Sequence, residues 1–296
     1  MTDPMQGIYP VLLTPVTDTG AVDGEALARE VDFCVRAGTH GVVYPVLGSE
    51  FQYLTESERR DMVGVVVRAA DGRVPVVAGA AGPTVAHAVE CARLAADAGA
   101  DAVIALPPYL AAANRGEIRA YYAAVSEAAQ RPVFIQHSQP GMDPAFLAEM
   151  LNEMEWVQYV KEEQPPSAHN ITGVLAGVGD QCKGVFGGGH SRWMMSELER
   201  GATGFMPASE ATDVHVQIWE AWVAGDRAGA RTLFNQLLPL INQVLMLGLP
   251  LCKEILVRRG VFTSAAMRTP GSGSMDEGDH RELDAVLADL QPLFKV

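Results

Sequence analysis

The sequence predicts an α/β fold of the (β/α)8 TIM-barrel class with a C-terminal helical extension. Eight short apolar runs alternate with segments of helical periodicity, and successive runs start about 28 residues apart, the size of one strand–helix unit in a parallel sheet. The runs are apolar almost throughout, as strands covered on both faces are. An open doubly wound sheet is the alternative, but eight units of near-equal length favour the barrel.

The predicted strands are rich in Val, Ile and Tyr, and they end in turns that contain Gly or Pro. They cover residues 7–15, 41–48, 74–82, 101–109, 131–138, 156–163, 182–189 and 201–209. In barrels of this class the reactive groups come from the carboxyl ends of the strands. The last residues of each run are therefore the candidates for chemistry.

Helices are predicted between the strands at residues 24–38, 55–72, 84–100, 115–130 and 143–154. In the first of them, Leu27, Val31 and Cys34 recur at helical spacing, and Gly38 can end the helix. Thr55 followed by Glu58 is a capping pattern that predicts the start of the second.

The chain continues with more helix than a minimal barrel needs. Amphipathic or apolar patterns cover residues 213–225, 227–248 and 250–260, a polar loop covers 268–280, and a last helix covers 281–294. No long linker precedes them. We therefore predict a barrel over residues 1–212 and a helical extension over 213–296 packed on it as one structural unit.

Composition and charge narrow the class of partner. The chain has 296 residues, of which 48% are hydrophobic and 20% charged, the proportions of a globular protein. The formal net charge of −14 argues against a nucleic-acid or anionic-membrane partner. Neither a targeting segment nor a membrane span is recognisable, and the four scattered cysteines are typical of reduced thiols, so a cytoplasmic location is expected.

Lys161 is the candidate with the clearest chemistry. It follows an apolar strand sequence, Trp-Val-Gln-Tyr-Val, at the end of the sixth run. Burial there would disfavour the ammonium form and lower its pKa, making a nucleophilic amine available for a Schiff base. The alternative is a surface lysine at a strand end, paired with Glu162.

Because side chains alternate between the two faces of a strand, the sequence predicts which residues share a face with Lys161. If Val133 and Ile135 face the helices, Gln136 faces the barrel interior and His137 starts on the helix side. The alternation of faces often breaks down at the end of a strand, so His137 stays a candidate substrate-binding residue. Glu163 shares parity with Lys161 and could exchange protons with an imine; its alternative role is a solvated or structural acid.

Backbone groups are the candidates for binding a substrate carboxylate. Gly48 and Ser49 lie at the end of the second run. Gly187 and Gly188 lie near the end of the seventh, where glycines have no side chain and so let a ligand approach the backbone. Plain turns are the alternative. Neither a nucleotide-binding glycine motif nor a histidine pair at metal-binding spacing is present, so no cofactor and no metal is predicted.

These segments resemble, in order along nearly the whole chain, the dihydrodipicolinate synthase / N-acetylneuraminate lyase family of Schiff-base barrels. The matching segments are LLTPV followed by Asp23, GVVYPVLGSEFQYLTESER, VPVVAGAAGPT, ADAVIALPPY and YVKEE. The resemblance assigns the Schiff-base role to Lys161. It implies a 2-oxo acid substrate and a homo-oligomer, either a tetramer or a dimer.

The chain departs from the family at its proton relay. The family's threonine pair falls on Leu47 and Gly48, the second tyrosine of Pro-Tyr-Tyr on Leu110, and the Tyr-Asn motif on the residues around Gln136. The sequences VFIQ, KEE and GVFGGG-x3-W-x3-E-L-x-R-GA-x-GFMPA are closer to the branch that contains 2-keto-3-deoxy-L-arabonate dehydratases.

We therefore expect a Schiff-base lyase, a dehydratase of a 2-keto-3-deoxy sugar acid. An amide such as Gln136 is a poor acid or base but can hold a substrate hydroxyl, which favours dehydration over aldol cleavage. Two alternatives stay open: a class I aldolase that releases pyruvate, and a catalytically silent barrel that binds a 2-oxo acid.

Overall fold

The structure is a computed structural model that describes residues 4–138 and 141–296. The chain divides into two compact units. The first unit consists of Met1–Tyr9 and Pro75–Met206, and the second of Pro10–Val74 and Pro207–Val296.

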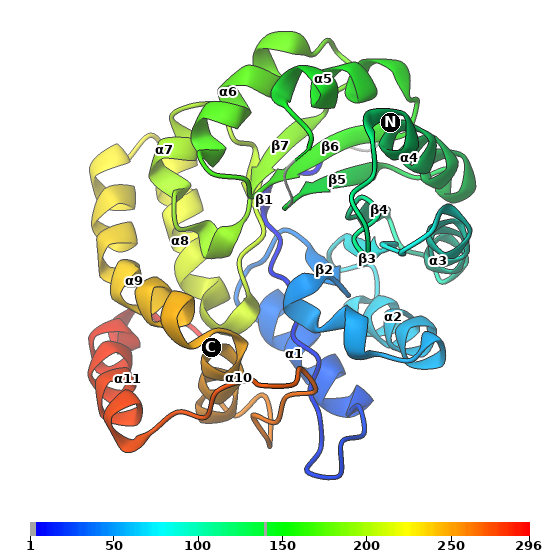
Figure 1. Ribbon diagram of the computed structural model, residues 1–296. Helices are drawn as coiled ribbons and strands as arrows, with labels where there is room; N and C mark the ends of the chain where they lie inside the picture. The colour runs from blue at the N-terminus through cyan, green and yellow to red at the C-terminus, as the bar shows by residue number, and fades with distance from the viewer. Residues whose placement is uncertain (1–3, 139–140) are drawn as a thin grey trace. The chain divides into compact units, whose positions relative to one another are not determined.

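The first unit contains a parallel sheet. Its strands are hydrogen-bonded in the order β1, β8, β7, β6, β5, β4, β3. Their bounds are β1 (Gly7–Ile8), β3 (Val76–Gly79), β4 (Ala102–Ala105), β5 (Val133–His137), β6 (Val157–Glu162), β7 (Gly184–Gly187) and β8 (Gly204–Phe205). Figure 1 shows β5, β6 and β7 side by side.

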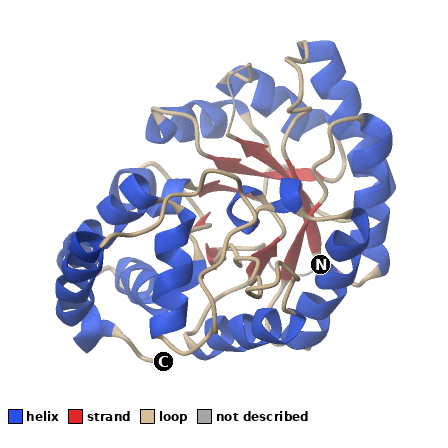
Figure 2. Ribbon diagram, turned by 60° about the horizontal axis from the view of Figure 1, so that its bottom comes forward, coloured by secondary structure: helices blue, strands red, loops and turns tan. Residues whose placement is uncertain are grey.

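Helices follow most of these strands, as the alternating pattern predicts. They are α3 (Val85–Asp97), α4 (Arg115–Ala129), α5 (Pro144–Glu153), α6 (Ser167–Gly177) and the short α7 (Met194–Leu198). Figure 2 distinguishes strands in red from helices in blue. The side chains of Thr84, Asn114 and Asp143 cap α3, α4 and α5, which satisfies backbone N–H groups at each helix start.

The second unit contains one strand and most of the C-terminal helices. Its elements are α1 (Gly24–Arg36), β2 (Val42–Tyr44), α2 (Glu56–Ala70), α8 (Thr212–Val223), α9 (Arg227–Leu247), α10 (Leu249–Arg258) and α11 (Glu277–Leu290). The backbone of Val11 forms parallel bridges with Val43 and Ala208. Helices α9 and α11 pack side by side (Figure 1). Thr55 and Glu58 form the predicted capping box at the start of α2.

Several predicted bounds were wrong. The first run, 7–15, forms only a two-residue strand, because Pro10 and Pro15 have no N–H to donate to a ladder. The last helix begins at Glu277 rather than at residue 281, since Asp276 and Asp279 form a capping box. Helices α6 and α7 were not predicted; α6 contains Gly173 and Gly177, which weaken a helical pattern.

Aromatic rings support the strands where the candidate chemistry begins. Phe134 of β5 stacks on Tyr159 of β6 with ring centroids 4.4 Å apart, and Phe186 of β7 meets Phe134 edge-on at 5.3 Å. Gln136 and Lys161 come two residues after Phe134 and Tyr159 and are themselves register partners. Phe134 and Tyr159 therefore lie on the same face of the sheet as Gln136 and Lys161, one layer deeper, and Phe186 is level with Lys161 as its register partner on β7.

Within the described ranges, no helix has both the length and the apolar character needed to cross a membrane. Cys34, Cys91 and Cys252 are buried, and Cys182 is half-buried.

Candidate active site

Lys161 is the penultimate residue of strand β6 and is buried, with 4% of its surface exposed. Its Nζ lies 3.1 Å from Oε1 of Glu163. The alternative of a solvated lysine paired with Glu162 does not fit this burial or this partner. Lys161 is held instead on the interior face by the register that pairs it with Gln136 on one side and Phe186 on the other.

Glu163 is the centre of the hydrogen bonds around Lys161. Its Oε2 accepts a hydrogen bond of 2.9 Å from Nε2 of Gln136 and another from the hydroxyl of Ser138. Burial by itself would raise the pKa of Glu163, but the Lys161 ammonium and the hydrogen bonds from Ser138 and Gln136 lower it to about 2. Glu163 is therefore ionised at neutral pH, as an acceptor of protons must be.

The backbone holds Glu163 in place. Its N–H donates to the carbonyl of His137 at 3.0 Å, which extends the β5–β6 ladder by one residue, and the N–H of Gly189 donates to its Oε1 at 3.2 Å. Lys161, Gln136 and Glu163 are thus brought together, as strand parity predicts.

His137 lies elsewhere. Its Nδ1 is 2.7 Å from Oε2 of Glu162, and both side chains are buried. His137 and Glu162 are register partners, one residue out of phase with Gln136 and Lys161, so they occupy the opposite face of the sheet. The structure does not bring His137 to Lys161, and its substrate-binding role stays a prediction.

The glycines at the end of β7 make room for carboxylates of the protein itself. A Cβ at Gly188 would overlap Cγ and Oε1 of Glu163, and one at Gly187 would overlap Oε2 of Glu197 and the ring of Phe205. The N–H of Gly188 donates to the carbonyl of Glu162 at 3.0 Å. Binding of a substrate carboxylate by Gly187 and Gly188 stays a prediction.

Replacing Gly188 by alanine should displace Glu163 and lower kcat by about 10²-fold, the loss typical of a catalytic group moved by about 1 Å. Steady-state kinetics would measure it. Gly179→Ala is the matched control, because a Cβ there meets only Asn152 Oδ1 at 3.8 Å. A raised KM with unchanged kcat would show instead that the glycine makes room for substrate.

Gly48 and Ser49 belong to the second unit, in a short 3-10 turn over Leu47–Ser49. The hydroxyl of Ser49 donates to the carbonyl of Leu12 at 2.5 Å, and its N–H donates to the carbonyl of Val46 at 2.8 Å. Ser49 would have to give up these bonds to bind a ligand. The predicted carboxylate-binding role of Gly48 and Ser49 stays a prediction.

Sequence reasoning missed three polar residues around Glu162 and Glu163. Ser138 bonds to Glu163, Asn170 donates to Oε1 of Glu162 at 3.3 Å, and Glu197 is buried behind Gly187. Glu197 was visible as the glutamate of the E-L-x-R-GA pattern, but its distance along the chain from Lys161 hides the proximity. Gln139 and Pro140, part of the divergent motif after Gln136, lie outside the described residues.

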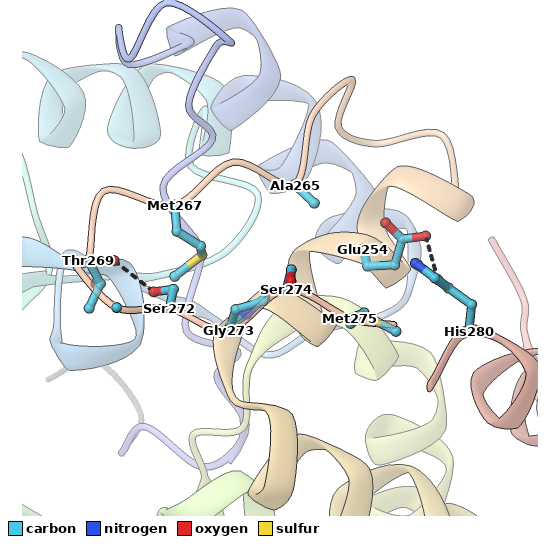
Figure 3. A pocket seen from close by; sticks show the side chains of 11 residues that line it. Glu254, Ala265, Met267, Thr269, Ser272, Gly273, Ser274, Met275 and His280 are labelled. Atoms are coloured by element: carbon cyan, nitrogen blue, oxygen red, sulfur yellow. Dashed lines mark hydrogen bonds and ion pairs between the residues drawn. The ribbon is translucent and has the colours of Figure 1, made fainter. Parts of the chain in front are cut away.

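The second unit has a pocket of about 390 Å3 (Figure 3). It is lined by α10, the loop after it and the start of α11, and Glu254 and His280 face each other across it at 3.8 Å. None of the predicted site residues lines this pocket.

Comparison with known proteins agrees with the fold. Residues 4–290 match the model of the dihydrodipicolinate synthetase family. An L-2-keto-3-deoxyarabonate dehydratase from Azospirillum brasilense is 31% identical over 295 residues, covering 97% of this chain and 95% of the relative. A 4-hydroxy-tetrahydrodipicolinate synthase from Methanopyrus kandleri is 29% identical and covers 80% of each chain.

Among solved structures, the dihydrodipicolinate synthase from Rhodopseudomonas palustris superposes with a TM-score of 0.89. The two chains are 27% identical, and the match covers 98% of this chain and 99% of that one. The fold is therefore an α/β barrel of eight parallel strands with C-terminal helices, which confirms the predicted class.

The fold and the family match together define a lyase of the class I aldolase and dehydratase type. The chain belongs to the dihydrodipicolinate synthetase family.

Proposed function

We propose that this protein is a dehydratase of a 2-keto-3-deoxy sugar acid that works through an imine on Lys161. The observation that carries the proposal is the pair of Lys161 and Glu163, 3.1 Å apart, with Gln136 bonded to the same carboxylate. The similarity to the Azospirillum dehydratase over the full chain supports the substrate class.

Among the chain's four lysines, Lys161 is the best placed nucleophile. Lys183 and Lys295 are not buried. Lys253 is buried, but its Nζ donates to Glu50 at 2.6 Å and to the carbonyl of Ala266 at 2.8 Å, and it lies on helix α10. Lys161 alone ends a barrel strand, where reactive groups of this fold gather.

Condensation of the Lys161 amine with the C2 carbonyl releases one water and leaves an electron sink at C2. Forming the imine also removes most N–H donors of the ammonium from Glu163. Burial raises the pKa of that carboxylate, and with the ammonium gone this effect is less opposed. Glu163 therefore becomes a stronger base when substrate is bound.

Dehydration follows if Glu163 takes the proton from C3 and the hydroxyl on C4 departs. The proton held by Glu163 can leave with that hydroxyl as water, which balances the step. Gln136 is suited to orienting the hydroxyl, because an amide donates and accepts hydrogen bonds without changing charge. The C3=C4 alkene left on the imine then tautomerises: a proton moves from C5 to C3, and the enol so formed passes its hydroxyl proton to C4, which makes C5 the second carbonyl. Water hydrolyses the imine and frees Lys161 with a dioxo acid product.

Incubation with a panel of 2-keto-3-deoxy sugar acids should give a 2,5-dioxo acid semialdehyde or a related dioxo acid, without pyruvate. Product identification by mass spectrometry tests this, with deuterium exchange at C3 in heavy water as a second readout. Stoichiometric pyruvate with an aldehyde, detected through a lactate dehydrogenase couple, would instead identify an aldolase. Neither product across the panel would favour the silent binding barrel.

A further inference from the structure

Directly behind Lys161, on the opposite face of the sheet, lies a group of buried polar residues that the proposed reaction does not use. We call it the back-face cluster: His137, Glu162, Ser167, Asn170 and Glu197. Nδ1 of His137 lies 2.7 Å from Oε2 of Glu162, and Oε1 of Glu162 accepts a hydrogen bond from Asn170. Gly187 is the register partner of Glu162 on β7 and gives the cluster its room.

Glu197 is the one member whose carboxyl group is only half satisfied. The residue is 1% exposed, and its Oε1 accepts a hydrogen bond of 2.5 Å from the hydroxyl of Ser167. Its Oε2 is buried against Gly187 and, in the part of the chain that the structure describes, has no hydrogen-bond partner. An ionised carboxylate with one bare oxygen is costly to bury, whereas a neutral acid costs much less.

The charges around Glu197 also favour its neutral form. Burial and the negative charges of Glu162 and Glu163 raise the pKa of Glu197 to about 7, against the lowering effect of the Ser167 hydrogen bond. The nearby basic side chains already have acidic partners, since Lys161 pairs with Glu163 and His137 lies on Glu162. In residues 4–138 and 141–296, no ion pair involves Glu197.

We propose that Glu197 is a positioning residue that holds a proton in the active enzyme, and that its ionisation slows imine formation at Lys161. This inference rests on the proposed function, because it concerns the same lysine. It does not depend on which 2-keto acid is the substrate or on whether water or pyruvate leaves.

The mechanism is electrostatic. Glu163 is ionised, and its Oε1 lies 3.1 Å from Nζ of Lys161. A neutral Glu197 adds no charge to this balance. When Glu197 loses its proton, a third carboxylate acts beside Glu162 and Glu163, favours the ammonium over the free amine, and reduces the fraction of enzyme able to attack a carbonyl.

Glu197→Gln separates charge from shape, since an amide reproduces the neutral acid at every pH. With pyruvate and cyanoborohydride, the rate of adduct formation by the wild-type protein should equal that of Glu197→Gln below roughly pH 6. Above pH 7 the wild-type rate should fall behind that of the variant, by about three- to tenfold at pH 8.5, the size expected from a shift of up to one pKa unit. Comparing the two proteins at each pH cancels the pH dependence of the reductant.

Infrared spectroscopy gives an independent readout that a purely structural role would not move. A protonated-carboxyl band that titrates near neutral pH should be present in the wild-type protein and lost in Glu197→Gln. Glu210→Gln is the matched control: Glu210 is also buried, with its pKa raised to about 7 chiefly by burial, but it belongs to the second unit. It should remove a band without altering the wild-type pH profile of adduct formation.

The outcomes are distinct. If the wild-type protein forms an adduct and its rate stays equal to that of Glu197→Gln across the range, or if no infrared band is lost, the inference is wrong and the proposed function stands. If the wild-type protein forms no adduct with any 2-oxo acid, the proposed function fails. Restoration of the pH-dependent loss by Glu197→Asp would support the role of the carboxyl group itself.

Discussion

Lys161→Ala should reduce lyase activity by at least about 10⁴-fold, because no other group can replace the nucleophile. The side chain is buried beside Glu163 at the end of β6, and the other buried lysine, Lys253, is held by Glu50. The measurement is kcat/KM together with borohydride trapping of the pyruvyl adduct. Peptide mapping should place the adduct on Lys161 in the wild-type protein, and the variant should form none.

Lys183→Ala is the control for this experiment. Lys183 is an exposed lysine whose Nζ donates to the carbonyl of Asp180, so its removal should leave both adduct and activity unchanged. An adduct on Lys183, Lys253 or Lys295 would contradict the assignment of the imine. Loss of activity with a retained adduct on the variant would also contradict it.

The largest effect on stability should come from Lys253→Met, which should lower the free energy of unfolding by about 3–5 kcal/mol. Lys253 and Glu50 form a fully buried ion pair in the second unit, 2.6 Å apart. Glu50 also accepts from the N–H groups of Arg268 and Thr269, at 2.9 and 2.7 Å, so it anchors the segment after α10. Removing the lysine leaves a buried carboxylate without its counter-charge.

Urea denaturation of the single and double variants tests this prediction. Adding Glu50→Gln to Lys253→Met should recover part of the loss, because the uncompensated charge is then gone. In the wild-type protein, Lys253 and the hydrogen bonds from Thr269 lower the pKa of Glu50 against the raising effect of burial. Glu50 therefore stabilises the fold above its unfolded pKa of about 4.3 and loses that contribution as the pH falls. A single variant as stable as the wild-type protein would show that the pair contributes nothing.

Lys253→Met should also change the sign of this pH dependence. Without the ammonium, burial raises the pKa of Glu50, so the variant should gain stability relative to the wild-type protein as the pH falls towards about 4. Measuring unfolding at two pH values distinguishes this electrostatic effect from a packing defect, which would be independent of pH.

Local sequence patterns predicted the fold class, and they also predicted that Lys161 and Glu163 lie on the same face of the sheet. Alternation with a period of two assigns Gln136, Lys161 and Glu163 to one face of adjoining strands, whatever the rest of the chain does. Helix caps, such as the one formed by Thr55 and Glu58, act within one helical turn, so they too can be predicted from the sequence. Bounds that depend on less regular segments, such as α6 with its two glycines, were not predicted.

Only the tertiary structure decided which polar groups meet. The register between β5 and β6 sets Gln136 beside Lys161 and His137 beside Glu162. The packing of α7 against β7 brings Glu197 to Gly187, so that the glycine accommodates a carboxylate of the protein as well as any ligand. The alternation of side chains between the two faces is a local property of each strand. These contacts instead join segments that are brought together only by strand pairing and helix packing, so no pattern within one segment encodes them.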